Sequence, residues 1–224
     1  VGVPGTAKSM AARVTANEMG LPLVVFDVGS VFGSLVGESE SRMRTALRTV
    51  EAMQGCIVLL DEVDKAWGNA VNAQGDSGVT QRVFGQFLSW LADKKDGSLI
   101  VATANRTSGL PPEMIRKGRF DEVFYTDVPN DEQRRLITEI HMRKRLLDPA
   151  VVFPTSDAWA KYITATDGYV GAELVAAVIE ARLFAKERGA DVPTADDMLR
   201  AVSEITPLSR LDSTNFEAIR DFCV

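Results

Sequence analysis

The chain has 224 residues, of which 46% are hydrophobic and 25% charged, so it is large enough for one domain or for one domain and a smaller one. Its formal net charge of −6 argues against a general electrostatic affinity for nucleic acid or anionic lipid. Two cysteines and a single histidine argue against a disulfide framework, a metal cluster, a zinc hydrolase or a Ser-His-Asp triad. We therefore expect a protein of the cytoplasm or an equivalent reducing compartment, and no stretch has the roughly 18 apolar residues of a membrane span.

Helix-like and strand-like segments alternate over the first 130 residues. Apolar residues at helical spacing indicate the helices, and short, nearly continuous apolar runs indicate buried parallel strands. This alternation requires crossover connections and predicts an α/β domain with a parallel sheet. The predicted helices cover residues 8–19, 39–54 and 79–95, and the predicted strands cover 21–28, 56–62, 98–105 and 122–129.

The strand signals stop after Pro129, and only helices are predicted beyond it. We expect an α/β domain over residues 1–130, a small helical domain over 131–206 and a helical tail over 207–224. Thr194, followed by Asp197 three residues on, resembles a capping box with Asp in place of Glu. The predicted helices cover residues 131–147, 156–166, 171–188 and 194–205.

The first motif is VGVPGTAKS, residues 1–9. It fits the phosphate-binding pattern G-x-x-x-x-G-K-[ST] at Gly2, Lys8 and Ser9, but Ala7 stands where the second glycine is expected. In such a loop Lys8 reaches the β- and γ-phosphates and Ser9 ligates Mg²⁺. A loop of this kind normally follows a buried strand, so we expect the first strand of the sheet upstream of Val1. The motif alone fits a working nucleotide site, a decayed one, or a glycine-rich turn before a helix.

Two carboxylates directly follow the second predicted strand. Residues 57–60 are apolar, and Asp61 and Glu62 stand at the carboxyl end of the run, where parallel sheets bind ligands. Asp61 is suited to the magnesium shell, and Glu62 is suited to polarise an attacking water. The pair could instead cap the strand and begin a helix. Their order and spacing after the loop favour the nucleotide site.

Polar residues beyond the third predicted strand extend this site. Asn105 would lie between Glu62 and the γ-phosphate, although asparagine is also common in strand-end turns. Arg116 and Arg119 are either surface charges or arginine fingers that act on the site of a neighbouring subunit.

Six stretches, in this order, resemble the AAA subfamily of AAA+ ATPases. They are GVPGTAKS, GSLVGESESRMR, IVLLDEVDK, VATANR, RKGRFDEVF and DGYVGAEL, and they are distributed over residues 2–174. The longer stretch FDVGSVFGSLVGESESRMRTAL resembles a group of stand-alone AAA ATPases named from a chloroplast reading frame. The resemblance implies a P-loop NTPase sheet domain with a helical lid, ATP and Mg²⁺ as cofactors, and a homo-hexameric ring.

The resemblance also assigns roles to individual residues. Lys8 and Ser9 would form Walker A, Asp61 and Glu62 would form Walker B, and Asn105 would be sensor 1. Magnesium would be held by Ser9 and, through water, by Asp61. The trans fingers would be Arg116 and Arg119. The nucleotide-binding set would be Gly2, Val3, Pro4, Gly5, Thr6, Ala7, Lys8, Ser9, Met10, Asp61, His141, Gly171 and Ala172.

His141 matches a histidine that lies near the base and ribose in relatives; without the resemblance it would be read as an ordinary helix residue. Gly171 and Ala172 occupy the place where some AAA+ branches carry a sensor 2 arginine. The first pore loop would comprise Ser34, Leu35, Val36 and Gly37, and the second would lie around residues 67–77. Leu35 stands where protein-threading members often have an aromatic residue.

Three functions remain open. A motor would hydrolyse ATP in a ring and remodel or unfold a protein partner. A scaffold would bind ATP to assemble, turn over slowly and regulate a complex. A nucleic-acid remodeller is disfavoured by the acidic net charge.

The effect of Ala7 depends on its backbone. With negative φ the alanine would cost little, whereas positive φ would add strain of about 1–2 kcal/mol. Strain of that size would weaken nucleotide binding by roughly tenfold. Because Lys8, Ser9, Asp61 and Glu62 are all present, the sequence favours a working site.

Overall fold

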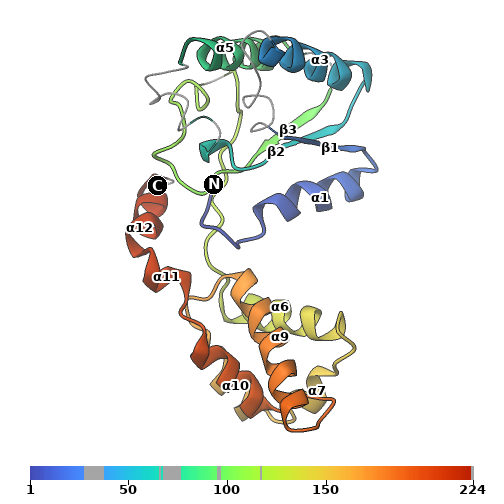
Figure 1. Cartoon of the computed structure of the whole chain (residues 1–224), viewed down its shortest axis with the longest axis vertical. Coiled ribbons are helices and arrows are strands. Elements are labelled where there is room, and N and C mark those ends of the chain that lie inside the picture. The colour runs from blue at the N-terminus through green and yellow to red at the C-terminus, as the bar shows by residue number, and fades with distance from the viewer. Residues whose placement is uncertain (28–37, 66, 68–76, 95–96, 117, 223–224) are drawn as a thin grey trace. The chain divides into compact units, whose positions relative to one another are not determined.

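The computed structural model describes residues 1–27, 38–65, 67, 77–94, 97–116 and 118–222 (Figure 1). The chain divides into two compact units. One is formed by Val1–Gly2, Ala7–Thr126 and Ala218–Val224, and the other by Val3–Thr6 and Asp127–Glu217.

The first unit contains a parallel sheet, as predicted. Among the described residues its strands are β1 (Leu23–Phe26), β2 (Ile57–Leu60) and β3 (Leu99–Ala102), in the spatial order β1-β2-β3. The register aligns the first residues of the strands, so the carboxyl ends of all three meet at one edge. That edge is where ligands bind in parallel sheets.

Helices cover both faces of this sheet. Figure 1 shows α1 (Lys8–Met19) on one face and the neighbouring helices α3 (Glu38–Ala52) and α5 (Ser77–Asp93) on the other. Successive side chains of a strand point to opposite faces. In β2, Ile57 and Leu59 pack with buried residues of α1, whereas Val58 and Leu60 belong to the larger core with α3 and α5. The central strand is therefore buried on both sides, which explains its uninterrupted apolar sequence.

The predicted end of the first helix is confirmed. Gly20 adopts φ 63° and ψ 26°, and its N–H bonds to the carbonyls of Ala16 and Asn17. This left-handed C-cap stops α1 at Met19, because glycine enters that region without a Cβ clash.

The predicted strand over residues 122–129 is wrong. In the described chain only Thr126 forms a bridge there, an isolated parallel one with Gly2. The nitrogen of Val1 donates to the Phe124 carbonyl at 2.6 Å, and the Thr126 N–H donates to the Val1 carbonyl at 2.8 Å. The apolar pattern of the segment is real, but a strand requires a paired neighbour along its length.

The second unit is helical, as predicted, with one short helix over residues 149–152 that the sequence did not indicate. Its longest helix, α9 (Gly171–Glu187), packs against α6 (Asp131–Arg143) and α10 (Ala195–Glu204). The core around it includes Tyr162, Leu174 and Met198. No helix in the described ranges is long and apolar enough to cross a bilayer. The helices after residue 130 are α6 (Asp131–Arg143), α7 (Pro149–Val152), α8 (Ser156–Ala165), α9 (Gly171–Glu187), α10 (Ala195–Glu204), α11 (Leu208–Leu211) and α12 (Ser213–Phe222).

Side-chain caps fix where several of these helices begin. The predicted capping box is confirmed: the Asp197 N–H donates to Thr194 Oγ1 at 3.3 Å, and the Thr194 N–H donates to Asp197 Oδ2 at 2.7 Å. Helix α6 ends at Arg143, earlier than expected, and Leu146 then takes φ 60° in the turn that leads to α7.

Candidate nucleotide-binding site

The loop of residues 2–7 is shaped by approaches that only glycine permits. The Gly2 N–H donates to the Ala104 carbonyl at 3.1 Å, and a Cβ on Gly2 would lie 2.4 Å from the Thr126 carbonyl oxygen. Gly5 has φ +83°, and a Cβ there would lie 2.8 Å from a methyl carbon of Val170. A side chain at either position would displace the backbone, and this explains why the motif has glycine at both.

Ala7 ends the loop in a strained conformation. It adopts φ 63° and ψ 21°, in the left-handed region, and is the N-cap of α1. Ala7 therefore has the positive φ for which the sequence predicts strain, and this backbone conformation costs about 1–2 kcal/mol. Alanine has no side-chain acceptor for the first N–H groups of α1. A helix N-terminus without a side-chain cap, directly after a glycine-rich loop, suits a phosphate.

Lys8 is the first residue of α1 and is partly buried. Burial lowers the pKa of Lys8 below its ordinary value of 10.5, while the nearby carboxylates of Asp64, Asp61 and Glu62 act in the opposite direction. A partly desolvated ammonium needs negative charge close by. In the described chain the carboxylates of Asp64, Asp61 and Glu62 supply that charge.

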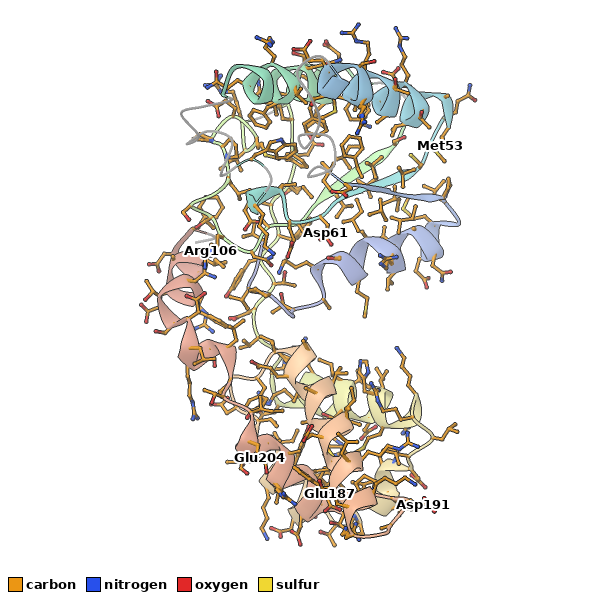
Figure 2. The ribbon with its side chains drawn as sticks, viewed as in Figure 1. Met53, Asp61, Arg106, Glu187, Asp191 and Glu204 are labelled. Carbon is orange, nitrogen blue, oxygen red and sulfur yellow. The ribbon has the colours of Figure 1, made fainter. Side chains whose placement is uncertain are left out.

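Ser9 and Asp61 are brought together from the helix start and the end of β2. Figure 2 shows Asp61 where the chain leaves β2. The Ser9 hydroxyl donates to Asp61 Oδ1 at 2.6 Å, and the Thr103 hydroxyl donates to the same oxygen at 2.5 Å. The contact joins the two motifs that the sequence places 52 residues apart.

Thr103 is a site residue that the sequence reasoning missed. It is 3% exposed, and its Oγ1 also accepts the Glu62 N–H at 3.0 Å. The Thr103 carbonyl accepts the Val63 N–H at 2.9 Å. Glu62 has φ +53°, a left-handed conformation that is unfavourable for glutamate. Thr103 therefore holds the backbone on both sides of the strained peptide and also fixes the Asp61 carboxylate.

The Glu62 side chain is held by two partners. Asn105 donates from Nδ2 to Glu62 Oε1 at 3.0 Å, and Lys65 Nζ lies 2.7 Å from Glu62 Oε2. Asn105 is buried, and its N–H donates to Asp64 Oδ1 at 3.1 Å. The structure thus brings Asn105 to Glu62, as the sequence predicts. Lys65 and Asp64 were not predicted.

Arg116 and Arg119 lie on the segment between Met114 and Phe120. Arg116 is exposed, and Arg119 is partly exposed and donates from Nη1 to the Glu113 carbonyl. Within one chain the two arginines are therefore surface groups. This exposure fits plain surface charges, and it equally fits arginine fingers that act on the site of a neighbouring subunit.

The predicted site residues fall into two groups, one in each unit. Within the second unit the Ala172 N–H donates to the Gly5 carbonyl at 3.3 Å, so these two predicted residues are in contact. The first unit holds Gly2, Ala7, Lys8, Ser9, Met10, Asp61, Glu62, Asn105, Arg116 and Arg119. The second unit holds Val3, Pro4, Gly5, Thr6, His141, Gly171 and Ala172.

His141 lies near the end of α6 and contacts Arg145. Arg145 donates to the His141 carbonyl at 2.9 Å, and its Nη1 lies 3.4 Å from His141 Nδ1. Burial, together with the charges of Lys144 and Arg145, lowers the pKa of His141 below 6.5. The imidazole is therefore neutral at pH 7, a state in which it can accept as well as donate a hydrogen bond.

The pore-loop predictions fall almost entirely outside the described residues. Residues 34–37 and 68–76 are among those not described. Trp67, at the edge of the second predicted loop, is 1% exposed and packs on Phe84 and Phe87 with ring centroids 5.1 and 5.3 Å away. That contact makes Trp67 a core residue.

The donor set of the first unit fits magnesium. Over the described ranges, no three His, Cys, Asp or Glu side chains gather as a metal cage. Magnesium commonly keeps several waters and takes one or two carboxylates together with substrate phosphates. Ser9 and Asp61, with hydroxyl and carboxylate in contact, are suited to this arrangement.

Comparisons with known proteins show the family of the chain. Residues 1–128 match the family described as "ATPase family associated with various cellular activities (AAA)". The chain is 39% identical over 227 residues to the uncharacterized AAA domain-containing protein ycf46 of Guillardia theta, covering 99% of this chain and 43% of that protein. It is 40% identical to ycf46 of Pyropia yezoensis, covering 98% of this chain and 44% of that protein.

More distant relatives include the ATP-dependent zinc metalloprotease FtsH of Thermotoga maritima, 32% identical over 92% of this chain and 33% of that protein. The chain spans less than half the length of each of these relatives. Membership of the family implies ATP as the nucleotide, with a dependence on Mg²⁺. With its first 128 residues matched, and with Ser9 in contact with Asp61 and Asn105 with Glu62 at one sheet edge, the chain belongs to the AAA family of ATPases.

Proposed function

We propose that this protein is a magnesium-dependent ATPase that acts as a ring and remodels a protein partner. The main support for the ATPase proposal is the contact between the two motifs at the carboxyl edge of the sheet. There the Ser9 hydroxyl meets Asp61, and Asn105 meets Glu62, at 2.6 and 3.0 Å. Both contacts lie in one compact unit beside the partly buried Lys8.

Each residue has a defined part in this proposal. Lys8 and the start of α1 bind the β- and γ-phosphates. Ser9, and Asp61 through water, hold Mg²⁺, which when bound neutralises phosphate charge. Glu62 polarises the attacking water, and Asn105 orients the Glu62 carboxylate through its Nδ2. His141 would lie near the base and ribose, and Gly171 and Ala172 would take the place of sensor 2.

The ring and the protein partner rest on the family. Arg116 and Arg119 are surface groups in one chain, and in a hexamer they would act on the nucleotide of the neighbouring subunit. A relative such as FtsH is named as an ATP-dependent protease. The net charge of −6 favours a protein partner over nucleic acid.

Ala7 favours a second candidate, a scaffold that assembles with ATP and turns it over slowly. Its left-handed backbone adds strain where phosphate would bind. Such a protein would form the same ring, but a partner would not stimulate its hydrolysis.

The ATPase rate against protein concentration, with mass measured with and without ATP, tests both proposals. The ATPase proposal predicts Mg²⁺-dependent hydrolysis that rises more steeply than protein concentration, a mass near six subunits with ATP, and loss of hydrolysis in Lys8→Ala. Absence of hydrolysis under assembling conditions would refute the ATPase. Ring formation with slow hydrolysis that protein substrates do not accelerate would favour the scaffold.

A further inference from the structure

The carboxylate of Glu62 has a cationic partner that the proposed mechanism does not use. One oxygen, Oε1, accepts from Asn105, a partner expected of the site. The other, Oε2, lies 2.7 Å from the ammonium of Lys65. Both oxygens of the group that should polarise water therefore have a partner within the chain.

Local backbone geometry places Lys65 over Glu62. The Lys65 N–H donates to the Glu62 carbonyl at 3.0 Å, closing a turn immediately after β2. Residues three apart in such a turn lie on the same side. The left-handed φ of +53° at Glu62 and the hydrogen bond of its N–H to Thr103 fix where this turn starts. The ion pair is thus set up by the same backbone that presents Glu62.

The ion pair between Lys65 and Glu62 is not explained by a contribution to folding stability. The side chains of Lys65 and Glu62 are 65% and 45% exposed, and an ion pair that accessible contributes little to folding. The hydrogen bond to Glu62 raises the pKa of Lys65, so the ammonium stays charged. A charged donor on one oxygen withdraws negative charge from the carboxylate and ties it to one rotamer.

We propose that Lys65 is a positioning residue that restrains Glu62, so that the ion pair keeps the carboxylate from polarising water and slows ATP turnover. This inference rests on the proposed ATPase function. Hydrolysis requires the Lys65–Glu62 bond to open while Asn105 retains the other oxygen. Removing the ammonium therefore accelerates the chemical step, an outcome that general damage to a site does not produce.

The test compares kcat and KM for ATP in Lys65→Ala, Lys65→Arg and wild type. Lys65→Ala is expected to raise kcat about two- to fivefold, the range set by an exposed ion pair, with KM within about twofold. Lys65→Arg retains a charged donor and should keep the wild-type kcat. The matched control is Lys161→Ala, because Lys161 forms a similar exposed pair with Asp157 at 2.8 Å in the other unit. It should leave kcat unchanged.

A second set of variants separates this inference from the ATPase proposal. Glu62→Gln should lose hydrolysis, and adding Lys65→Ala to it should produce no rise, because the restrained group is gone. An active wild type with a Lys65→Ala kcat at or below its own would overturn the restraint alone. A rise that persists in the Glu62→Gln background would also overturn it, since Lys65 would then act elsewhere. An inactive wild type would overturn both.

Discussion

Ala7 shows how one methyl group can tune a phosphate-binding loop. At φ 63° its Cβ makes the backbone unfavourable by about 1–2 kcal/mol, whereas glycine takes this region freely. Ala7→Gly also loosens the unfolded chain, which offsets about 0.4–1 kcal/mol of the gain. We expect unchanged or slightly higher stability, and ATP binding that is equal or up to about tenfold tighter.

Urea titration and nucleotide binding to Ala7→Gly measure these two quantities. Weaker ATP binding in the glycine variant would mean that the alanine methyl packs usefully in the bound state, contrary to the strain argument.

Thr103 should matter as much as the residues that the motifs identify. Thr103→Val keeps the shape but removes the acceptor of the Glu62 N–H and one donor to Asp61. Leaving buried polar groups without partners costs about 1–3 kcal/mol. We expect lower stability by that amount and at least a tenfold loss of kcat, because Glu62 and Asp61 lose their common support.

Thr103→Ser is the matched variant, since it retains the hydroxyl and loses only a methyl group. It should recover most of the activity in the same assay. Equal losses in the valine and serine variants would show that the methyl packing of Thr103, and not its hydroxyl, is what the site requires.

His141 offers a clean pH measurement because it is the only histidine in the sequence. Its pKa is lowered below 6.5 by burial and by Lys144 and Arg145, so the unfolded chain binds the proton more readily. Folding stability should therefore fall as pH drops below about 6.5 and level off below the folded pKa. An NMR titration of the single imidazole checks the direction, and a midpoint above 6.5 would contradict it.

Among single residues, the sequence predicted those that belong to a motif but not those that hold the motif residues in place. Lys8, Ser9 and Asp61 follow from fixed spacing and from the carboxyl end of a buried strand. Thr103 and Lys65 belong to no spacing rule. Their roles depend on the left-handed turn at Glu62, which nothing in the local sequence indicates.

Helices and strands could be predicted from the sequence where the apolar residues follow one clear pattern, either helical spacing or a continuous apolar run. Residues 8–19 and the apolar run 57–60 have strong local patterns, and the structure places α1 and β2 there. The segment 122–129 has a strand-like pattern but pairs only through Thr126, because sheet membership depends on a neighbour and not on the segment itself. The short helix α7 was missed since four residues carry too little periodicity to detect.

Glu173 links two elements of the helical unit and provides a test at this scale. One oxygen accepts the Val170 N–H at 2.8 Å at the start of α9, and the other accepts the Leu208 N–H at 2.6 Å at the start of α11. Glu173→Ala should destabilise this unit by about 1–2 kcal/mol, because both helix starts lose an acceptor. Amide hydrogen exchange at Leu208 should accelerate.

Two further variants serve as controls for the hydrogen exchange at Leu208. Glu173→Gln keeps one acceptor oxygen and should lie between wild type and alanine. Glu187→Ala, at the exposed opposite end of the same helix (Figure 2), should leave exchange at Leu208 unchanged. Fast exchange in Glu187→Ala as well would point to general loosening of α9.

At the scale of the whole molecule, the proposed site is incomplete within one chain if Arg116 and Arg119 act on a neighbour. A head-to-tail ring pairs the nucleotide face of each subunit with the arginine face of the next. Arg119→Ala should then bind ATP but hydrolyse it poorly, and Lys8→Ala should fail to bind while its arginines stay intact. Each variant alone is expected to be nearly inactive, although each retains the part that the other lacks.

Mixing the two variants in equal amounts distinguishes action in trans from action within one chain. A working interface needs an Arg119→Ala subunit to supply the nucleotide site and a Lys8→Ala subunit to supply the arginine. Random assembly produces that order at about a quarter of the interfaces, so the mixture should recover about a quarter of the wild-type rate if interfaces act independently. Arg116→Ala mixed with Lys8→Ala should behave alike. Mixed rings that are confirmed by mass yet remain inactive would show that these arginines do not complete a neighbouring site, because every needed group would be present across the interface and still produce no hydrolysis.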